Sequence, residues 1–170
     1  EVYGQVSTLL SLGVGFNARL TGRENVILGG LAAGLTRAEI EEQFSAIADF
    51  ADIGEAIDSP MKTYSAGMYS RLAFAVAVVV EPDVLIVDEA LSTGDAKFKK
   101  KSLEKIKTLR GENRAIILVS HALATIKEIC NDVIWLDKGK IVMRGNPDEV
   151  VAAYKESLQV AKSSSADEDL

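Results

Sequence analysis

The sequence predicts an α/β fold in which a mostly parallel sheet with flanking helices is joined to an all-helical subdomain. Two apolar runs, at residues 84–87 and 115–119, are bounded by polar residues, as in parallel strands that are covered on both faces. Between residues 21 and 81, by contrast, the chain shows helix caps and helical periodicity. We therefore expect a core formed by residues 1–20 and 82–158, a helical subdomain at 21–81 and a disordered acidic tail at 159–170.

The first half of the chain predicts one strand followed by three helices. Thr21 with Glu24, and Thr36 with Glu39, have the spacing of capping boxes, in which each side chain satisfies an N–H group at the start of a helix. Ser65 precedes a long apolar stretch that ends before a proline, where the helical conformation is disfavoured. The expected elements are a strand at residues 6–12 and helices at 22–33, 37–51 and 66–80.

The second half alternates strands and helices. Each apolar run is followed by a helical pattern, which is typical of parallel strands joined by crossover helices. Near the end, the polar segment at residues 137–140 separates two short apolar runs, which predicts a hairpin. The expected elements are strands at residues 84–87, 115–119, 133–136 and 141–143 and helices at 96–109, 123–130 and 147–158.

Composition excludes several classes of function. The 19 basic and 25 acidic side chains give a net charge of −6, which disfavours nonspecific binding to nucleic acid. The longest apolar run, at residues 72–80, is far shorter than the roughly 20 residues that span a bilayer. The single cysteine excludes an internal disulfide, and with one histidine it cannot form a structural zinc site. We interpret the basic cluster at residues 97–110 as a solvated helix face.

Two carboxylates, Asp88 and Glu89, directly follow the apolar strand expected at residues 84–87. Adjacent carboxylates repel each other and lose hydration at the end of a buried strand, so a ligand of opposite charge would explain them. In this interpretation Asp88 helps to hold Mg²⁺ through its water shell, and Glu89 polarises a water molecule toward a γ-phosphate. The alternative is that the two acids only mark the end of the strand.

Two helix starts carry polar groups, and the first of them suits a phosphate. Ser65 and Gly67 open the helix expected at residues 66–80, where backbone N–H groups are free and glycine lacks the Cβ that would keep a ligand away. The turn Ser92-Thr93-Gly94-Asp95 offers two hydroxyls and an acid just past the carboxylates. Taken alone, each of these motifs is also typical of an ordinary helix N-cap.

A histidine is expected at the same edge of the sheet as the two carboxylates. Ser120 and His121 follow the strand at residues 115–119, just as Asp88 and Glu89 follow the strand before it. Because ligands of open parallel sheets bind at the carboxyl ends of the strands, His121 is predicted to contact the γ-phosphate. The alternative for a lone histidine is a structural hydrogen bond.

Taken together, these motifs and their order resemble the nucleotide-binding subunit of ATP-binding-cassette (ABC) transporters over about residues 3–158. In that family's terms residues 64–68 resemble the signature motif, 84–89 the Walker B strand, 92–95 the D-loop and His121 the switch histidine. Within the family, Tyr-Ser-Ala-Gly-Met and Asp-Glu-Ala-Leu-Ser-Thr-Gly-Asp resemble the branch that exports bacterial O-antigen, teichoic acid and cell-wall galactan. Residues 9–16 and 20–25 are similar to that branch as well.

The resemblance implies a P-loop NTPase core and an ATPase that uses ATP and Mg²⁺. It also implies a head-to-tail homodimer that drives integral membrane permease subunits, carries lipid-linked polysaccharide outward and lies at the cytoplasmic face of the membrane. The implied catalytic residues are Glu89 and His121, the metal-binding residue is Asp88, and the nucleotide-binding residues are Ser65, Ala66, Gly67, Met68, Ser92, Gly94 and Asp95. The alternatives are a non-transport ATPase of DNA repair or translation, and an inactive interaction fragment.

Three departures from the family pattern bear on activity. The chain has no Gly-x-x-x-x-Gly-Lys-Ser/Thr loop, which is the Walker A motif that holds the β- and γ-phosphates, so we expect an N-terminally truncated chain. The Q-loop glutamine has no counterpart, because Ser11-Leu12-Gly13 occupies the matching stretch, and Ala66 stands where serine or glycine is usual.

We predict that the 170 residues alone neither bind ATP tightly nor hydrolyse it, because the loop that holds the phosphates is missing. Calorimetry with Mg-ATP should give no heat of binding at micromolar concentrations, and saturable micromolar binding would contradict this prediction.

Overall fold

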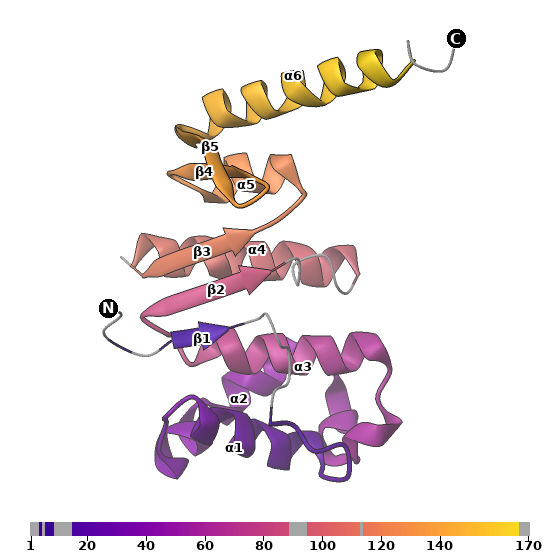
Figure 1. Ribbon diagram of the computed structural model, residues 1–170. Coiled ribbons are helices and arrows are strands. Elements are labelled where there is room, and N and C mark those ends of the chain that lie inside the picture. Colours follow the sequence, from indigo (N-terminus) through magenta and orange to yellow (C-terminus); the bar gives the residue numbers. More distant parts are fainter. Residues whose placement is uncertain (1–3, 5, 9–14, 89–94, 113, 167–170) are drawn as a thin grey trace. The chain divides into compact units, whose positions relative to one another are not determined.

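The structure is a computed structural model that describes residues 4, 6–8, 15–88, 95–112 and 114–166, with side chains as far as residue 159 (Figure 1). By their internal contacts, the residues fall into two compact units, Glu1–Val119 and Ser120–Leu170, which we describe separately. The division predicted from the sequence, into a core at residues 1–20 and 82–158 and a helical subdomain at 21–81, differs from these two units and stays a prediction.

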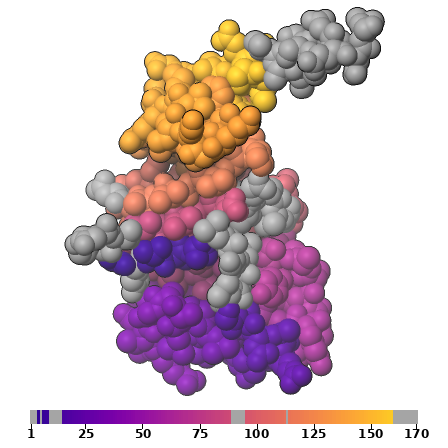
Figure 2. All heavy atoms as spheres, viewed as in Figure 1, coloured from indigo at the N-terminus to yellow at the C-terminus, as the bar shows by residue number. Residues whose placement is uncertain are grey.

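The segment at residues 22–79 of the first unit is mainly helical. Its elements are the α-helices α1 (Gly22–Ala32), α2 (Arg37–Ala51) and α3 (Ala66–Val79) and the 3₁₀ helices η1 (Gly54–Asp58) and η2 (Met61–Thr63). Both predicted capping boxes are present: the Thr21 hydroxyl oxygen accepts from the Glu24 N–H at 3.2 Å, and Thr36 and Glu39 repeat the arrangement. Figure 2 shows these helices as one closely packed body in indigo, violet and magenta.

Apolar faces of the three α-helices form the core of this helical body. Val26 from α1, Ile47 from α2 and Leu72 from α3 are each 1% exposed or less. The two 3₁₀ helices contribute Ile57 and Met61 to the same cluster. Sequence periodicity did not predict η1 and η2, because a single 3₁₀ turn is too short to show a repeating apolar face.

The sheet of the first unit is parallel, as predicted. It has the order β1 (Val6–Thr8), β2 (Val84–Asp88), β3 (Ala115–Val119), and α4 (Ala96–Gly111) connects the last two strands (Figure 1). The expectation that both apolar strands are covered on both faces is wrong for β3, where Ile117 and Val119 are 54% and 55% exposed. Among the described residues β3 pairs with β2 alone, so it lies at an edge of the sheet. Ile117 and Val119 lie at alternate positions of β3 and therefore share one face, which the described residues leave open.

The second unit contains α5 (Leu123–Ile129), the antiparallel strands β4 (Val133–Asp137) and β5 (Lys140–Gly145), and α6 (Pro147–Ala166). The predicted hairpin is confirmed, and its two turn residues, Lys138 and Gly139, have φ angles of 46° and 78°. Two positive φ values in a two-residue loop are typical of the type I′ turn, whose twist matches that of the strands. The Trp135 ring packs edge-on against Tyr154 of α6 at 5.4 Å between ring centroids.

Helix α6 corrects one expectation. It continues past the predicted end at residue 158 as far as Ala166, where disorder was expected from residue 159. Gln, Val, Ala and Lys at residues 159–162 include good helix formers, and extending an existing helix gains a backbone hydrogen bond for each residue that becomes ordered. None of the helices in the described part of the chain is both long enough and apolar enough to cross a bilayer.

Candidate functional site

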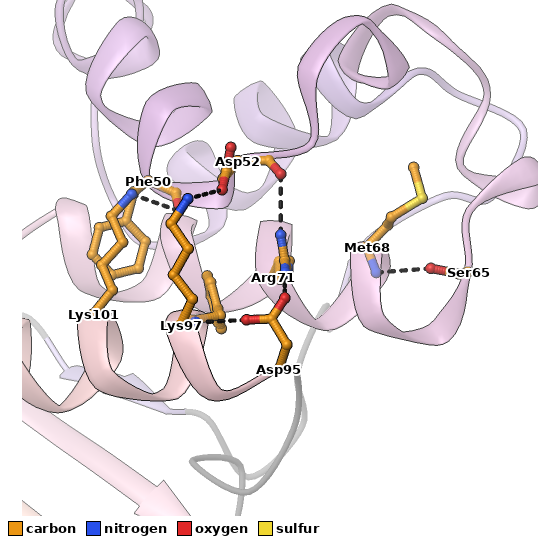
Figure 3. Close-up of polar contacts among 9 residues, drawn as sticks. Phe50, Asp52, Ser65, Met68, Arg71, Asp95, Lys97 and Lys101 are labelled. Atoms are coloured by element: carbon orange, nitrogen blue, oxygen red, sulfur yellow. Dashed lines mark hydrogen bonds and ion pairs between the residues drawn. The ribbon is translucent and has the colours of Figure 1, made fainter.

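The N-terminus of α3 is formed by the serine that the sequence singles out. The Ser65 hydroxyl oxygen accepts a hydrogen bond from the Met68 N–H at 3.2 Å and so caps the helix (Figure 3). Ser65 and Ala66 are both exposed. Of the residues that the structure describes, a Cβ added at Gly67 would meet only Ser65, at 3.8 Å from its hydroxyl oxygen, so these residues leave the space beside this turn open.

This helix start can donate hydrogen bonds to an anion. The first N–H groups of a helix have no carbonyl partner within the helix, and the helix dipole favours negative charge there. Because the Ser65 oxygen accepts from Met68, its own hydrogen is available to a ligand. The geometry therefore fits the predicted phosphate contact at Ser65 and Gly67, and that contact stays a prediction.

An ion pair connects α3 to the N-terminus of α4. Asp95 is the N-cap of α4, since its Oδ1 accepts from the Phe98 N–H at 2.8 Å, as predicted for the end of the turn at residues 92–95. Its Oδ2 pairs with the Arg71 guanidinium, which also donates to the Asp52 carbonyl at 3.1 Å (Figure 3). The Arg71 side chain is only 19% exposed. One guanidinium thus joins the end of α2, the second turn of α3 and the start of α4.

The local field shifts the pKa of Asp95. The Phe98 N–H bond lowers the pKa of this carboxyl below its ordinary value of 3.8, and the Arg71 charge lowers it further. Asp95 therefore stays ionised at neutral pH and keeps both its cap and its ion pair.

Lysines of the basic cluster hold α4 to the end of α2. The Lys101 ammonium donates to the carbonyls of Asp49 and Phe50 at 2.8 and 3.2 Å, and the Lys97 ammonium pairs with the Asp52 carboxylate at 3.3 Å (Figure 3). Carbonyls at the C-terminus of a helix lack partners within it and attract cations. The interpretation of this cluster as a solvated face holds at Lys97, whose side chain is 84% exposed, and is corrected at Lys101, which is partly buried against α2.

Asp88 is the last residue of β2 and pairs in register with Val119, the last residue of β3. The carboxyl ends of the two strands thus meet at one edge of the sheet, as predicted. No group of three or more histidine, cysteine or acidic side chains in the described ranges could hold a metal ion by itself. One carboxylate fits Mg²⁺ nonetheless, because this ion keeps several waters and takes its remaining ligands from substrate phosphates.

His121 lies in the second unit and is exposed. The neighbouring Ser120 hydroxyl oxygen accepts from the Ala122 N–H at 3.0 Å, just before α5 begins. The predicted site residues Glu89, Ser92 and Gly94 lie outside the described residues, as does the stretch 11–13 that replaces the Q-loop glutamine. The roles predicted for His121 and for these residues stay predictions.

A sequence model described as "ABC transporter" matches residues 3–92 of this chain, which is more than half of its length. The chain belongs to the ABC transporter family. The fold predicted from the signature-like and Walker B-like motifs is thereby confirmed as that of this family.

Relatives in the ABC transporter family are similar along nearly the whole chain. The O-antigen export system ATP-binding protein RfbB of Myxococcus xanthus is 45% identical over 98% of this chain, and the teichoic acids export ATP-binding protein TagH of Lactococcus lactis is 43% identical over 94%. The chain spans 38% and 34% of the lengths of these two relatives.

Solved structures of ABC proteins share the fold. An ATP-binding subunit of an ABC transporter superposes with a TM-score of 0.77 at 24% identity, over 89% of this chain and 62% of the other. A dimeric ATP-binding cassette in a post-hydrolysis state, bound to ADP and Pi, superposes with a TM-score of 0.68 at 18% identity, over 84% and 63%.

Sequence reasoning missed Arg71 and Asp52 as parts of this site. Arg71 is one polar residue near the start of a mainly apolar helix, and its partner Asp95 is 24 positions away. Asp52 is the C-cap of α2 with a φ of 51°, a conformation that aspartate adopts more readily than most residues. The one signal for Asp52 in the sequence was its position, as a short acidic residue at the end of an amphipathic helix.

Acid is expected to weaken the contacts that Asp95 makes with Arg71 of α3 and with the start of α4. Because the folded-state pKa of Asp95 lies below its ordinary value, its stabilising contribution is fully present above pH 3.8 and is lost as the pH falls through the lower folded pKa. Between about pH 5 and pH 2.5 the melting temperature should therefore fall further in the wild type than in Asp95→Asn. Asparagine keeps the N-cap but carries no charge. Parallel melting curves against pH would contradict the ion pair, and differential scanning fluorimetry gives the comparison.

Proposed function

We propose that this chain is part of the ATP-hydrolysing subunit of an ABC exporter that moves a lipid-linked cell-surface polysaccharide across the cytoplasmic membrane. The observation that carries the proposal is the open, capped start of α3 at Ser65 and Gly67, joined by Arg71 to the cap of α4. The O-antigen and teichoic acid export functions named for its relatives support the choice of cargo.

In the proposed mechanism, Ser65 and the first N–H groups of α3 bind the phosphates of a nucleotide held by the partner subunit of a head-to-tail homodimer. Bound Mg²⁺ would neutralise charge on the β- and γ-phosphates, with Asp88 holding its water shell. Glu89 orients and polarises the attacking water, and His121 donates a hydrogen bond to the γ-phosphate. Ser92, Gly94 and Asp95 line the subunit interface beside the nucleotide, together with Ala66 and Met68.

The helical body offers a surface for the permease. On α1, Leu28 and Leu31 are 36% and 49% exposed, and a hollow of about 290 Å³ lies between α1 and α2. The hollow is lined by Arg23, Ile27, Arg37, Ile40, Glu41 and Phe44. Apolar side chains beside basic ones suit a cytoplasmic loop or short helix of a membrane protein. Binding there would keep the subunit at the cytoplasmic face of the membrane.

Affinity purification from detergent-solubilised membranes tests the proposal. The full-length protein should co-purify with a polytopic permease, and its ATPase activity should rise when lipid-linked glycan is supplied. Leu31→Glu should weaken co-purification, whereas Leu158→Glu, at a position 45% exposed in the other unit, serves as the matched control. Co-purification with ribosomes or DNA in place of a permease would contradict transport and favour the non-transport alternative.

A further inference from the structure

Tyr64, the residue before the Ser65 cap, is held by hydrogen bonds of its side-chain hydroxyl and of its backbone N–H. Its hydroxyl donates to the Ala56 carbonyl at 2.6 Å, and the residue is half-buried. Burial raises the pKa of the Tyr64 hydroxyl above its ordinary value of 10.0, which is itself well above neutral pH, so the hydroxyl is a proton donor. Its backbone N–H donates to the Met61 carbonyl at 3.0 Å, which fixes the main chain on the N-terminal side of Ser65.

Gly22 makes room for this hydroxyl. A Cβ added at Gly22 would overlap with the Tyr64 hydroxyl oxygen and would lie 3.0 Å from the Ile57 carbonyl oxygen. Gly22 is buried at the first position of α1, and its φ lies outside the left-handed region, so the backbone does not require glycine there. The Tyr64 hydroxyl is therefore the nearest obstacle to a side chain at residue 22, with the Ile57 carbonyl and the Leu72 side chain behind it.

The segment before α1 is paired with the segment that leads to Tyr64. The Met61 N–H donates to the Leu20 carbonyl at 2.9 Å, and the Lys62 N–H donates to the Ala18 carbonyl at 2.8 Å. The Gly22 N–H closes the pairing with a 3.3 Å bond to the Ser59 carbonyl. We call residues 18–22 and 59–62 the paired strip.

A buried asparagine holds the same segment from inside α1. Asn25 is 0% exposed, and its Oδ1 accepts from the Asn17 N–H at 2.6 Å. Its amide nitrogen donates to the carbonyls of Asn17, Leu20 and Thr21 at 3.0, 3.3 and 2.8 Å. With both polar atoms of its buried amide paired, Asn25 makes the segment before α1 a rigid part of the helical body.

We propose that Tyr64 is a positioning residue for Ser65, and that its contact with Gly22 sets where the capped start of α3 lies relative to the paired strip. A displacement of residues 18–22 then reaches Ser65 through the Leu20–Met61 and Ala18–Lys62 hydrogen bonds and through the Tyr64 ring. This inference rests on the proposed function, in which Ser65 completes a nucleotide site across a subunit interface.

Four variants of the full-length protein test the inference: Gly22→Ala, Tyr64→Phe, the double variant, and Gly111→Ala as a control. Among the described residues, a Cβ at Gly111 meets nothing within 4 Å. The measurements are nucleotide affinity of the monomer, ATP-driven dimerisation in the Glu89→Gln background, and melting temperature.

Gly22→Ala should weaken ATP-driven dimerisation by about tenfold or more, and Tyr64→Phe by about five- to tenfold, which is the scale of one lost hydrogen bond. Monomer nucleotide affinity should stay within about twofold of the wild type in both, because the inference places Ser65 on the partner's nucleotide. The double variant should dimerise better than Gly22→Ala alone, since the overlapping oxygen is gone. Gly111→Ala should behave as the wild type.

The possible failures can be told apart. We call the protein with Gly22 and Tyr64 unchanged the parent: the wild type for hydrolysis and Glu89→Gln for dimerisation. If the parent neither hydrolyses ATP nor dimerises with it, the proposed function fails. If the parent does both and the Gly22 and Tyr64 variants dimerise normally, the positioning role is wrong. In a third outcome, Gly22→Ala loses monomer nucleotide affinity and dimerisation to the same extent, and the double variant recovers neither. That result would indicate general destabilisation and would also overturn the inference.

Discussion

Glu89→Gln in the full-length protein should lower ATP turnover by about 10²–10⁴-fold while nucleotide stays bound, which is the range expected when a general base is removed. Glutamine keeps the size of the side chain but cannot take or polarise the proton of the attacking water. ATP should therefore accumulate between two subunits. Phosphate release gives the rate, and size-exclusion chromatography with Mg-ATP should show a long-lived dimer.

Glu55→Gln is the matched control for this experiment. Glu55 is an exposed acid of η1 in the same protein, so it tests the loss of one negative charge without touching the proposed site. Its turnover should equal that of the wild type. Normal turnover in Glu89→Gln would remove Glu89 from the mechanism and leave the two strand-end acids with a structural explanation.

Phe74→Ala should have the largest effect on stability, a loss of about 3–5 kcal/mol in the free energy of unfolding. Phe74 is 1% exposed and lies between two other rings. It stacks on Phe50 of α2 at 6.0 Å and meets Phe98 of α4 edge-on at 5.8 Å. The alanine variant leaves a cavity where three helices meet, and chemical denaturation followed by circular dichroism measures the loss.

Leu31→Ala provides the comparison for Phe74→Ala. Leu31 also belongs to the helical body, but it is 49% exposed, so truncation should change the free energy of unfolding by no more than about 0.5 kcal/mol. If the two variants were equally stable, the aromatic cluster would not be the joint between α2, α3 and α4.

Much of the fold could be predicted because it depends on local interactions. The helix at residues 37–51 was predicted from Thr36 and Glu39, and α2 has the same bounds. The strand at residues 115–119 was likewise predicted to the residue. The exposure of β3 was not predicted, because an apolar run shows that a strand prefers burial but not how many neighbours it has.

The candidate site could likewise be predicted only where it depends on local interactions. Ser65 was identified as a candidate cap, and the turn at residues 92–95 as a candidate N-cap motif, because a cap bonds to an N–H group only three positions along the chain. The partner of Asp95 could not be identified, because Arg71 lies two turns into another helix and its position depends on how α3 packs. Lys101 was assigned to solvent for the same reason, since the C-terminal carbonyls of α2 to which it donates come from a distant part of the chain.

The amino-acid sequence alone determined the α/β class, the caps of the helices, the parallel strands and the order of the motifs, because each depends on side-chain patterns within a few residues. The tertiary structure alone decided that Arg71 joins three helices and that a Cβ at Gly22 would overlap with the Tyr64 hydroxyl. Such contacts join segments 19 or more positions apart, and they form only where packing of the apolar faces brings two backbones together.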